Sequence, residues 1–177
     1  MRLALVTTVL AGAAIAAAPP ALASSGGQTP SHAEITTAVR QAERSPSLWA
    51  TINICNSRRY RDILGVRGQL PALGFPSELS MDIQVNYWST ADKRFVAINS
   101  SKAVSRVSLG SASTGAQQGG GVFSFPPHSG LLNATIKFAW TLDGKVIGQT
   151  QRATSAGHPG ADFGSPPHFS AASCKIP

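Results

Sequence analysis

The sequence predicts an all-β fold, an antiparallel β-sandwich with one short helix on its N-terminal side. Apolar and polar residues alternate with a period of two in several short segments, as in strands that bury one face. No helical pattern separates these segments, so neither crossover helices nor a parallel sheet is expected. The 17 glycines and 12 prolines fit a chain with many turns. Two stacked sheets would bury the apolar faces, and a closed β-barrel is the alternative.

The first 23 residues have the pattern of a secretory signal peptide. Met1 and Arg2 precede an apolar run over residues 3–18, and an A-x-A cleavage site follows at residues 21–23. An uncleaved membrane anchor is the alternative, but a bilayer span needs about 20 apolar residues and this run is shorter. No later segment has that character, so we expect a secreted or extracytoplasmic protein without an integral membrane segment after cleavage.

Residues 24–47 are predicted to form a linker and a short helix. Residues 24–30 are rich in Ser, Gly and Pro, and Ser31 and Glu34 match a capping box that starts a helix over residues 31–44. A helix of this length is marginal when isolated. We therefore expect it to be loosely attached to the domain or dispensable.

The β-sandwich domain is assigned to residues 48–177. A Ser/Gly/Gln-rich segment at 111–121 is expected to be a mobile loop, and residues 155–168 a second loop. Asp143-Gly144 predicts a two-residue hairpin turn. The predicted strands are residues 48–55, 63–70, 81–88, 94–99, 105–109, 122–125, 132–142, 145–153 and 169–176.

The longest predicted strand, residues 132–142, has the clearest alternation. Ile136, Phe138 and Trp140 share one face and are expected to enter the core. Lys137 and Thr141 lie on the opposite face and are expected to meet solvent.

Cys55 and Cys174 are the two cysteines of the chain. Export would place them in an oxidising compartment, so a disulfide is expected, and a reactive thiol is the alternative. Closing a loop of about 100 residues stabilises a fold by about 4.7 kcal/mol in the chain-entropy model.

Three segments carry a resemblance to a known family: residues 48–55, the strand–turn–strand unit at 83–98, and residues 132–152. On these the chain resembles the immunoglobulin-like β-sandwich domains of exported, mostly uncharacterised bacterial proteins. The resemblance implies the architecture and no functional site. It departs from antibody domains, whose disulfide joins two internal strands, because Cys174 lies close to the end of the chain.

No motif for nucleophilic, metal-dependent or nucleotide chemistry occurs in the sequence, and no catalytic residue, metal ligand or cofactor is predicted. The acidic residues are not spaced as a catalytic pair. His128, His158, His168 and Asp162 lie in predicted loops, where a metal site is possible, but their spacing matches no zinc pattern and solvated histidines are the favoured interpretation.

Two surface features are candidates for binding. The formal net charge is +7, and the densest group of basic residues is Arg58-Arg59-Tyr60-Arg61. Such a group either binds an anionic polymer or forms a solvated basic loop. Trp49 and Trp88 lie on polar strand faces, where they either form an aromatic platform for a sugar or peptide or pack under a loop.

These observations favour an exported, non-enzymatic binding or structural module at the cell surface or in the medium, with an unknown ligand. A secreted hydrolase whose site is assembled only in the fold is the first alternative. The second is a binder of acidic cell-surface polymer through the basic loop. Another extracytoplasmic protein is also a possible partner.

Overall fold

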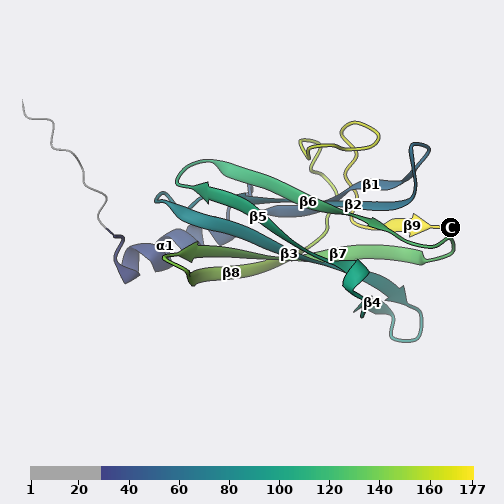
Figure 1. The fold of residues 1–177 in the computed structure, drawn as a ribbon, viewed down its shortest axis with the longest axis horizontal. Coiled ribbons are helices and arrows are strands. Elements are labelled where there is room, and N and C mark those ends of the chain that lie inside the picture. Colours follow the sequence, from purple (N-terminus) through teal and green to yellow (C-terminus); the bar gives the residue numbers. More distant parts are fainter. Residues whose placement is uncertain (1–28) are drawn as a thin grey trace, which may run out of the picture.

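The computed structural model describes residues 29–177. The predicted signal peptide and the start of the linker lie outside this range. Two antiparallel sheets stack face to face, with a helix at the end of the molecule opposite the C-terminus (Figure 1). The elements are α1 (His32–Glu43), β1 (Trp49–Ser57), β2 (Tyr60–Pro71), β3 (Ser77–Ser89), β4 (Arg94–Ala97), the 3-10 turn η1 (Ser101–Ala103), β5 (Val104–Ala112), β6 (Ala116–Ser124), β7 (Gly130–Leu142), β8 (Lys145–Ala153) and β9 (Cys174–Ile176).

The strand order confirms an all-β sandwich with a short N-terminal helix. The first sheet has the order β1-β2-β6, and the second has the order β4-β3-β7-β8. Strand β3 is long enough to pair twice along one edge, first with β5 and then with β4. Strand β9 pairs with the first residues of β7, at the edge where β8 pairs further along. The second sheet therefore has six strands and a long, continuous outer face.

The core lies between the two sheets and has the predicted register. Ile136, Phe138 and Trp140 are fully buried, whereas Lys137 is exposed. The Phe138 ring fits against Gly68 of the facing sheet, where an added Cβ would lie 3.0 Å from the ring. The Trp140 indole nitrogen donates a hydrogen bond of 2.8 Å to the carbonyl oxygen of Pro71, so its polar atom is satisfied inside the core.

The predicted disulfide is present. Cys55 of β1 is bonded to Cys174 of β9, with their Cα atoms 5.4 Å apart and a sequence separation of 119. The bond joins one edge of the first sheet to one edge of the second. It therefore ties the first strand of the domain to the last.

The expectation of a mobile loop at residues 111–121 is wrong. The segment contains the β5–β6 turn and most of β6, which pairs with β2 over its whole length. Its glycines allow this close pairing: a Cβ at Gly119 would clash with the Leu109 side chain, and one at Gly120 would clash with the carbonyl oxygen of Val66. The glycine-rich composition of this segment, which indicated mobility, is explained by the lack of space for side chains between β6 and its neighbours.

The last predicted strand, residues 169–176, is correct only at its end. Regular pairing begins at Cys174, and before it Ala171 makes an isolated bridge to Ile52 of β1. The hairpin turn between β7 and β8 is as predicted, with positive φ at both Asp143 and Gly144.

The helix is capped as predicted but is not loosely attached. The Ser31 and Glu34 side chains each accept a hydrogen bond from the other's backbone nitrogen, which completes the capping box. Ala42 is buried, and Val39 packs so closely on Gly148 that a Cβ there would lie 2.7 Å from it. The helix therefore covers part of the core beside Trp140. Within residues 29–177, no helix has both the length and the apolar character needed to cross a membrane.

Removal of the helix is therefore expected to destabilise the domain. A chain that starts at Ser47 should lose about 2 kcal/mol of unfolding free energy, because burying one valine-sized side chain is worth about 1.5–3 kcal/mol. Thermal or urea denaturation measures the loss. In the full chain, Val39→Ser should reproduce part of it, while Thr37→Ser on the exposed face should not. An unchanged midpoint for the shortened chain would restore the interpretation of a dispensable helix.

The register of β7 is tested by two neighbouring substitutions. Phe138→Ala should cost about 3–5 kcal/mol, the usual cost of emptying a large buried aromatic site. Lys137→Ala, on the exposed face, should change the free energy of unfolding by less than about 0.5 kcal/mol. Urea denaturation of both variants is sufficient, and equal costs would contradict the assigned register.

Candidate functional site

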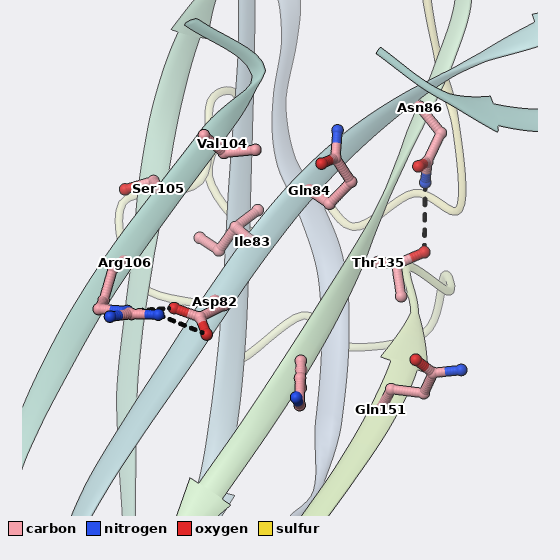
Figure 2. Close-up of a pocket in the computed structure, with 10 residues that line it drawn as sticks. Asp82, Ile83, Gln84, Asn86, Val104, Ser105, Arg106, Thr135 and Gln151 are labelled. Atoms are coloured by element: carbon pink, nitrogen blue, oxygen red, sulfur yellow. Dashed lines mark hydrogen bonds and ion pairs between the residues drawn. The ribbon is translucent and has the colours of Figure 1, made fainter. Parts of the chain in front are cut away.

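The outer face of the second sheet holds a groove of about 770 Å³, which we call the outer groove (Figure 2). It crosses strands β5, β3, β7 and β8, and all of its lining residues except Ile83 and Val104 have polar side chains, whose carbon atoms also form part of the surface. The lining residues are Asp82, Ile83, Gln84, Asn86, Val104, Ser105, Arg106, Thr135, Lys137 and Gln151.

Strand alternation and pairing assemble this polar lining. Met81, Ile83 and Val85 of β3 are buried in the core, so Asp82 and Gln84 between them point outward. Asp82 is paired in register with Arg106 of β5 on one side and with Lys137 of β7 on the other. Residues from well-separated parts of the sequence thus form rows across the outer face.

Two side-chain amides form the floor of the outer groove. The Asn86 amide nitrogen donates hydrogen bonds to the Asn133 side-chain oxygen (2.9 Å) and to the Thr135 hydroxyl (3.2 Å). The Gln84 amide nitrogen donates to the carbonyl oxygens of Val85 (2.7 Å) and Ile98 (3.1 Å). Both amide nitrogens are thereby fixed. Their oxygens have no hydrogen-bond partner among residues 29–177 and face the groove as acceptors (Figure 2).

A bidentate ion pair lies at the β5 side of the outer groove. Arg106 donates from Nε to Asp82 Oδ1 (2.7 Å) and from Nη2 to Asp82 Oδ2 (3.3 Å). The hydrogen bond from Arg106, and then the charge of Asp82, raise the pKa of Arg106 above its ordinary value. Exposed pairs of this kind add little stability. Their effect here is to hold a planar guanidinium and a carboxylate in fixed positions on the sheet.

An aromatic pair lies beyond the amides, towards the end of β3. Trp88 is two residues after Asn86 and 39% exposed. It is paired in register with Phe95 of β4, and the two rings meet edge to face with centroids 5.2 Å apart. Trp88 thus continues the outward-facing row of β3 and presents an apolar ring next to the polar groove.

The other candidate tryptophan, Trp49, is packed under a loop. Its ring stacks on His158 with centroids 4.9 Å apart and an interplanar angle of 13°. The segment between β8 and β9 crosses the outer face of the first sheet here, and Asn53 donates a hydrogen bond of 2.7 Å to the Asp162 carbonyl oxygen. The loop covers Trp49, so of the two tryptophans only Trp88 is available to a ligand.

The basic group Arg58-Arg59-Tyr60-Arg61 is at the tip of the β1–β2 hairpin. Arg58 and Arg59 form the turn, all three arginines are exposed, and the Arg59 guanidinium lies 5.4 Å from the centre of the Tyr60 ring. None of the four residues lines the outer groove. The histidines are also dispersed, and within residues 29–177 no three His, Cys, Asp or Glu side chains form a group able to hold a metal ion.

The sequence analysis did not predict the outer groove. Gln84, Asn86, Thr135 and Gln151 each occur as an ordinary polar residue in an alternating strand. The polar faces of β3 and β7 are the one feature of the sequence that indicates such a groove. The strand order and register that bring these faces together are not local properties of the sequence.

Comparison with known proteins identifies no family. No family model and no curated protein matches the chain. Among solved structures, 64% of the chain superposes on a glycosyl hydrolase family 2 member from Bacteroides cellulosilyticus (TM-score 0.36, 11% identity). It also superposes over 64% on a putative beta-galactosidase from Bacteroides fragilis (TM-score 0.32, 14% identity). The matched regions span 15% and 17% of those chains.

The stack of His158 on Trp49 predicts a pH-dependent contribution to stability. Burial lowers the pKa of His158, so the folded state binds a proton less readily than the unfolded state, in which the pKa is about 6.5. The stabilising contribution is therefore complete above that pH and is lost as the pH falls below it. Between pH 8 and pH 5 the urea midpoint of the wild type should fall further than that of His158→Gln. Parallel pH profiles would show that this histidine does not contribute.

Proposed function

We propose that this chain is an exported, immunoglobulin-like binding module whose outer groove takes a glycan chain. The observation that carries the proposal is the row of fixed polar side chains on β3 and its neighbours, which continues directly into the exposed ring of Trp88. The disulfide supports an extracytoplasmic location, because such bonds persist in oxidising compartments.

The chemistry of the outer groove matches that of a sugar. A sugar hydroxyl both donates and accepts hydrogen bonds, and the groove offers the acceptor oxygens of Gln84 and Asn86 together with the ammonium group of Lys137 as a donor. The C–H face of a sugar ring is apolar, and Trp88 provides an exposed aromatic surface for it. A groove open along the sheet suits an extended chain better than a small compact ligand.

The same geometry favours binding over hydrolysis. Glycoside hydrolysis uses two carboxyl groups on opposite sides of the bond that is cleaved. Asp82 is the one carboxylate among the residues that line the outer groove, and both of its oxygens accept hydrogen bonds from Arg106. The groove therefore supports the binding module more strongly than the secreted hydrolase.

Calorimetric titration with cellohexaose, chitohexaose and maltohexaose tests this function. At least one of the three should bind the wild type, and Trp88→Ala should weaken that binding about tenfold, equivalent to about 1.4 kcal/mol. Gln84→Ala should weaken it as well, because it removes a fixed acceptor.

The matched control is Phe163→Ala, which removes an 80% exposed aromatic ring from the loop over the first sheet. This variant should bind like the wild type. Binding unaffected by Trp88→Ala, or no binding of any of the three oligosaccharides, would contradict the proposal. Release of shorter sugars during the titration would instead support the hydrolase.

A further inference from the structure

Several segments at the end of the molecule that carries the C-terminus are rich in Lys and Arg (Figure 1). They are the β1–β2 hairpin, the β3–β4 turn and strand β9, and we call this region the basic end. All six of their Lys and Arg side chains are exposed: Arg58, Arg59, Arg61, Lys93, Arg94 and Lys175.

The antiparallel topology brings these residues to one end. Strands β1, β3 and β9 run towards it, and β2 and β4 run back from it. The Cys55–Cys174 bond fixes Lys175 beside the base of the β1–β2 hairpin. Lys175 is also paired in register with Leu131 of β7, which links it to the second sheet. The sequence shows only the first cluster, because the other cations are far from it along the chain.

The charge is unequal between the two ends of the molecule. The basic end holds six cations against two carboxylates, Asp62 and Asp92, and Asp92 accepts a hydrogen bond of 2.8 Å from the Ser89 hydroxyl. The opposite end, with α1 and the β7–β8 turn, holds four cations against four acidic side chains. The cations there are Arg40, Arg44, Lys145 and Arg152, whose guanidinium donates a hydrogen bond to the Glu43 carbonyl oxygen, and the acidic residues are Glu34, Glu43, Glu78 and Asp143. The basic excess of the chain is therefore concentrated at one end.

The cations of the basic end are not neutralised by internal partners. Within residues 29–177 the one ion pair is that of Arg106 with Asp82 in the outer groove. Arg59 is held over the ring of Tyr60, which orients its guanidinium at the tip of the hairpin. Guanidinium groups bind carboxylates and phosphates through two parallel hydrogen bonds, so an oriented arginine at a tip is suited to an anionic group.

We propose that the basic end binds a linear anionic polysaccharide. Arg58 and Arg61 line one small hollow at the β1–β2 hairpin, but the other cations lie on separate segments. A polymer with repeated negative groups can therefore engage several segments at once, whereas a small anion meets the cations of one segment at most. The β1–β2 and β3–β4 turns contain no large apolar side chain able to enter a membrane; the latter turn is Thr90, Ala91, Asp92 and Lys93. The turns themselves therefore favour a hydrated polymer, and the exposed Tyr87, Trp88 and Leu131 beside them are the reason for comparison with a lipid surface in the test below. The basic end shares no residue with the outer groove. The two proposed sites can therefore be tested independently of each other.

Two triple variants of equal charge test the proposal in the full-length protein. Arg58→Gln/Arg59→Gln/Arg61→Gln removes three positive charges from the basic end. Arg40→Gln/Arg44→Gln/Lys145→Gln removes three from the opposite end. The probe is polygalacturonate, neutral dextran is the control polymer, and binding is measured as a function of salt concentration.

The wild type should bind polygalacturonate with an affinity that falls as salt rises because counterions are released, whereas any binding of neutral dextran through the outer groove should not depend on salt. The hairpin variant should bind about tenfold more weakly, and its log–log salt slope should be shallower by about two, since each lost contact removes about 0.7. The opposite-end variant should stay within about twofold of the wild type in low salt. Lys93→Gln/Arg94→Gln should weaken binding independently, so the result does not depend on one hairpin.

Three results would overturn the proposal. Equal losses in the two triple variants would show an effect of net charge alone. Absence of polygalacturonate binding at low salt would remove the site. Stronger binding to phosphatidylglycerol vesicles or to duplex DNA than to polygalacturonate would assign the basic end to another class of partner. Trp88→Ala should bind polygalacturonate like the wild type, which separates this outcome from that of the outer groove.

Discussion

The bond between Cys55 and Cys174 is the constraint on which the last part of this structure depends. The segment after β8 has little regular pairing: β9 is three residues long, and before it there are isolated bridges to β1. Such a segment lacks the continuous hydrogen-bond ladder that holds the other strands. The disulfide fixes its end to β1, and the paired residues of β7 fix its register. The position of Lys175, and the return of the chain across the first sheet, follow from that attachment.

The returning chain makes the two outer faces of the sandwich unequal. On the first sheet it buries Trp49, Thr51 and Asn53, which alternation alone would expose. The loop is held by polar contacts as well as by the Trp49–His158 stack: Gln118 donates a hydrogen bond of 3.1 Å to the Gly160 carbonyl and accepts one of 3.0 Å from the Asp162 backbone nitrogen. On the second sheet no described segment crosses the groove, and the polar rows of β3 and β7 stay accessible. The molecule thus has one covered face and one open face, and the open face is the one that carries Trp88.

Local sequence patterns predicted the features that depend on local physics. Period-two alternation identified the inward face of β7, Asp143-Gly144 identified its hairpin, and Ser31 with Glu34 identified the helix start. The errors arose where tertiary contacts decide the outcome. The glycines of β6 indicated a mobile loop, whereas close approach of β2 and β5 requires them. The helix looked marginal in isolation but is held by Val39 against Gly148. The outer groove depends on the register between β3, β5 and β7, which no single segment encodes.

Strand β3 connects the two proposed surfaces. Its outward row runs from Asp82 through Gln84 and Asn86 to Trp88, and its following turn carries Lys93 at the basic end. The groove presents hydrogen-bonding groups in fixed positions. Hydrogen bonds are directional, so the strength of binding to these groups would depend on how the hydroxyls of a sugar are arranged. The basic end presents exposed cations, whose attraction to a polyanion is long-ranged at low salt and depends little on the identity of each unit. If both proposals hold, a polysaccharide attracted to the basic end is brought next to the groove. The order of these groups along one strand would then place the groups that attract a polysaccharide next to the groups that discriminate between sugars.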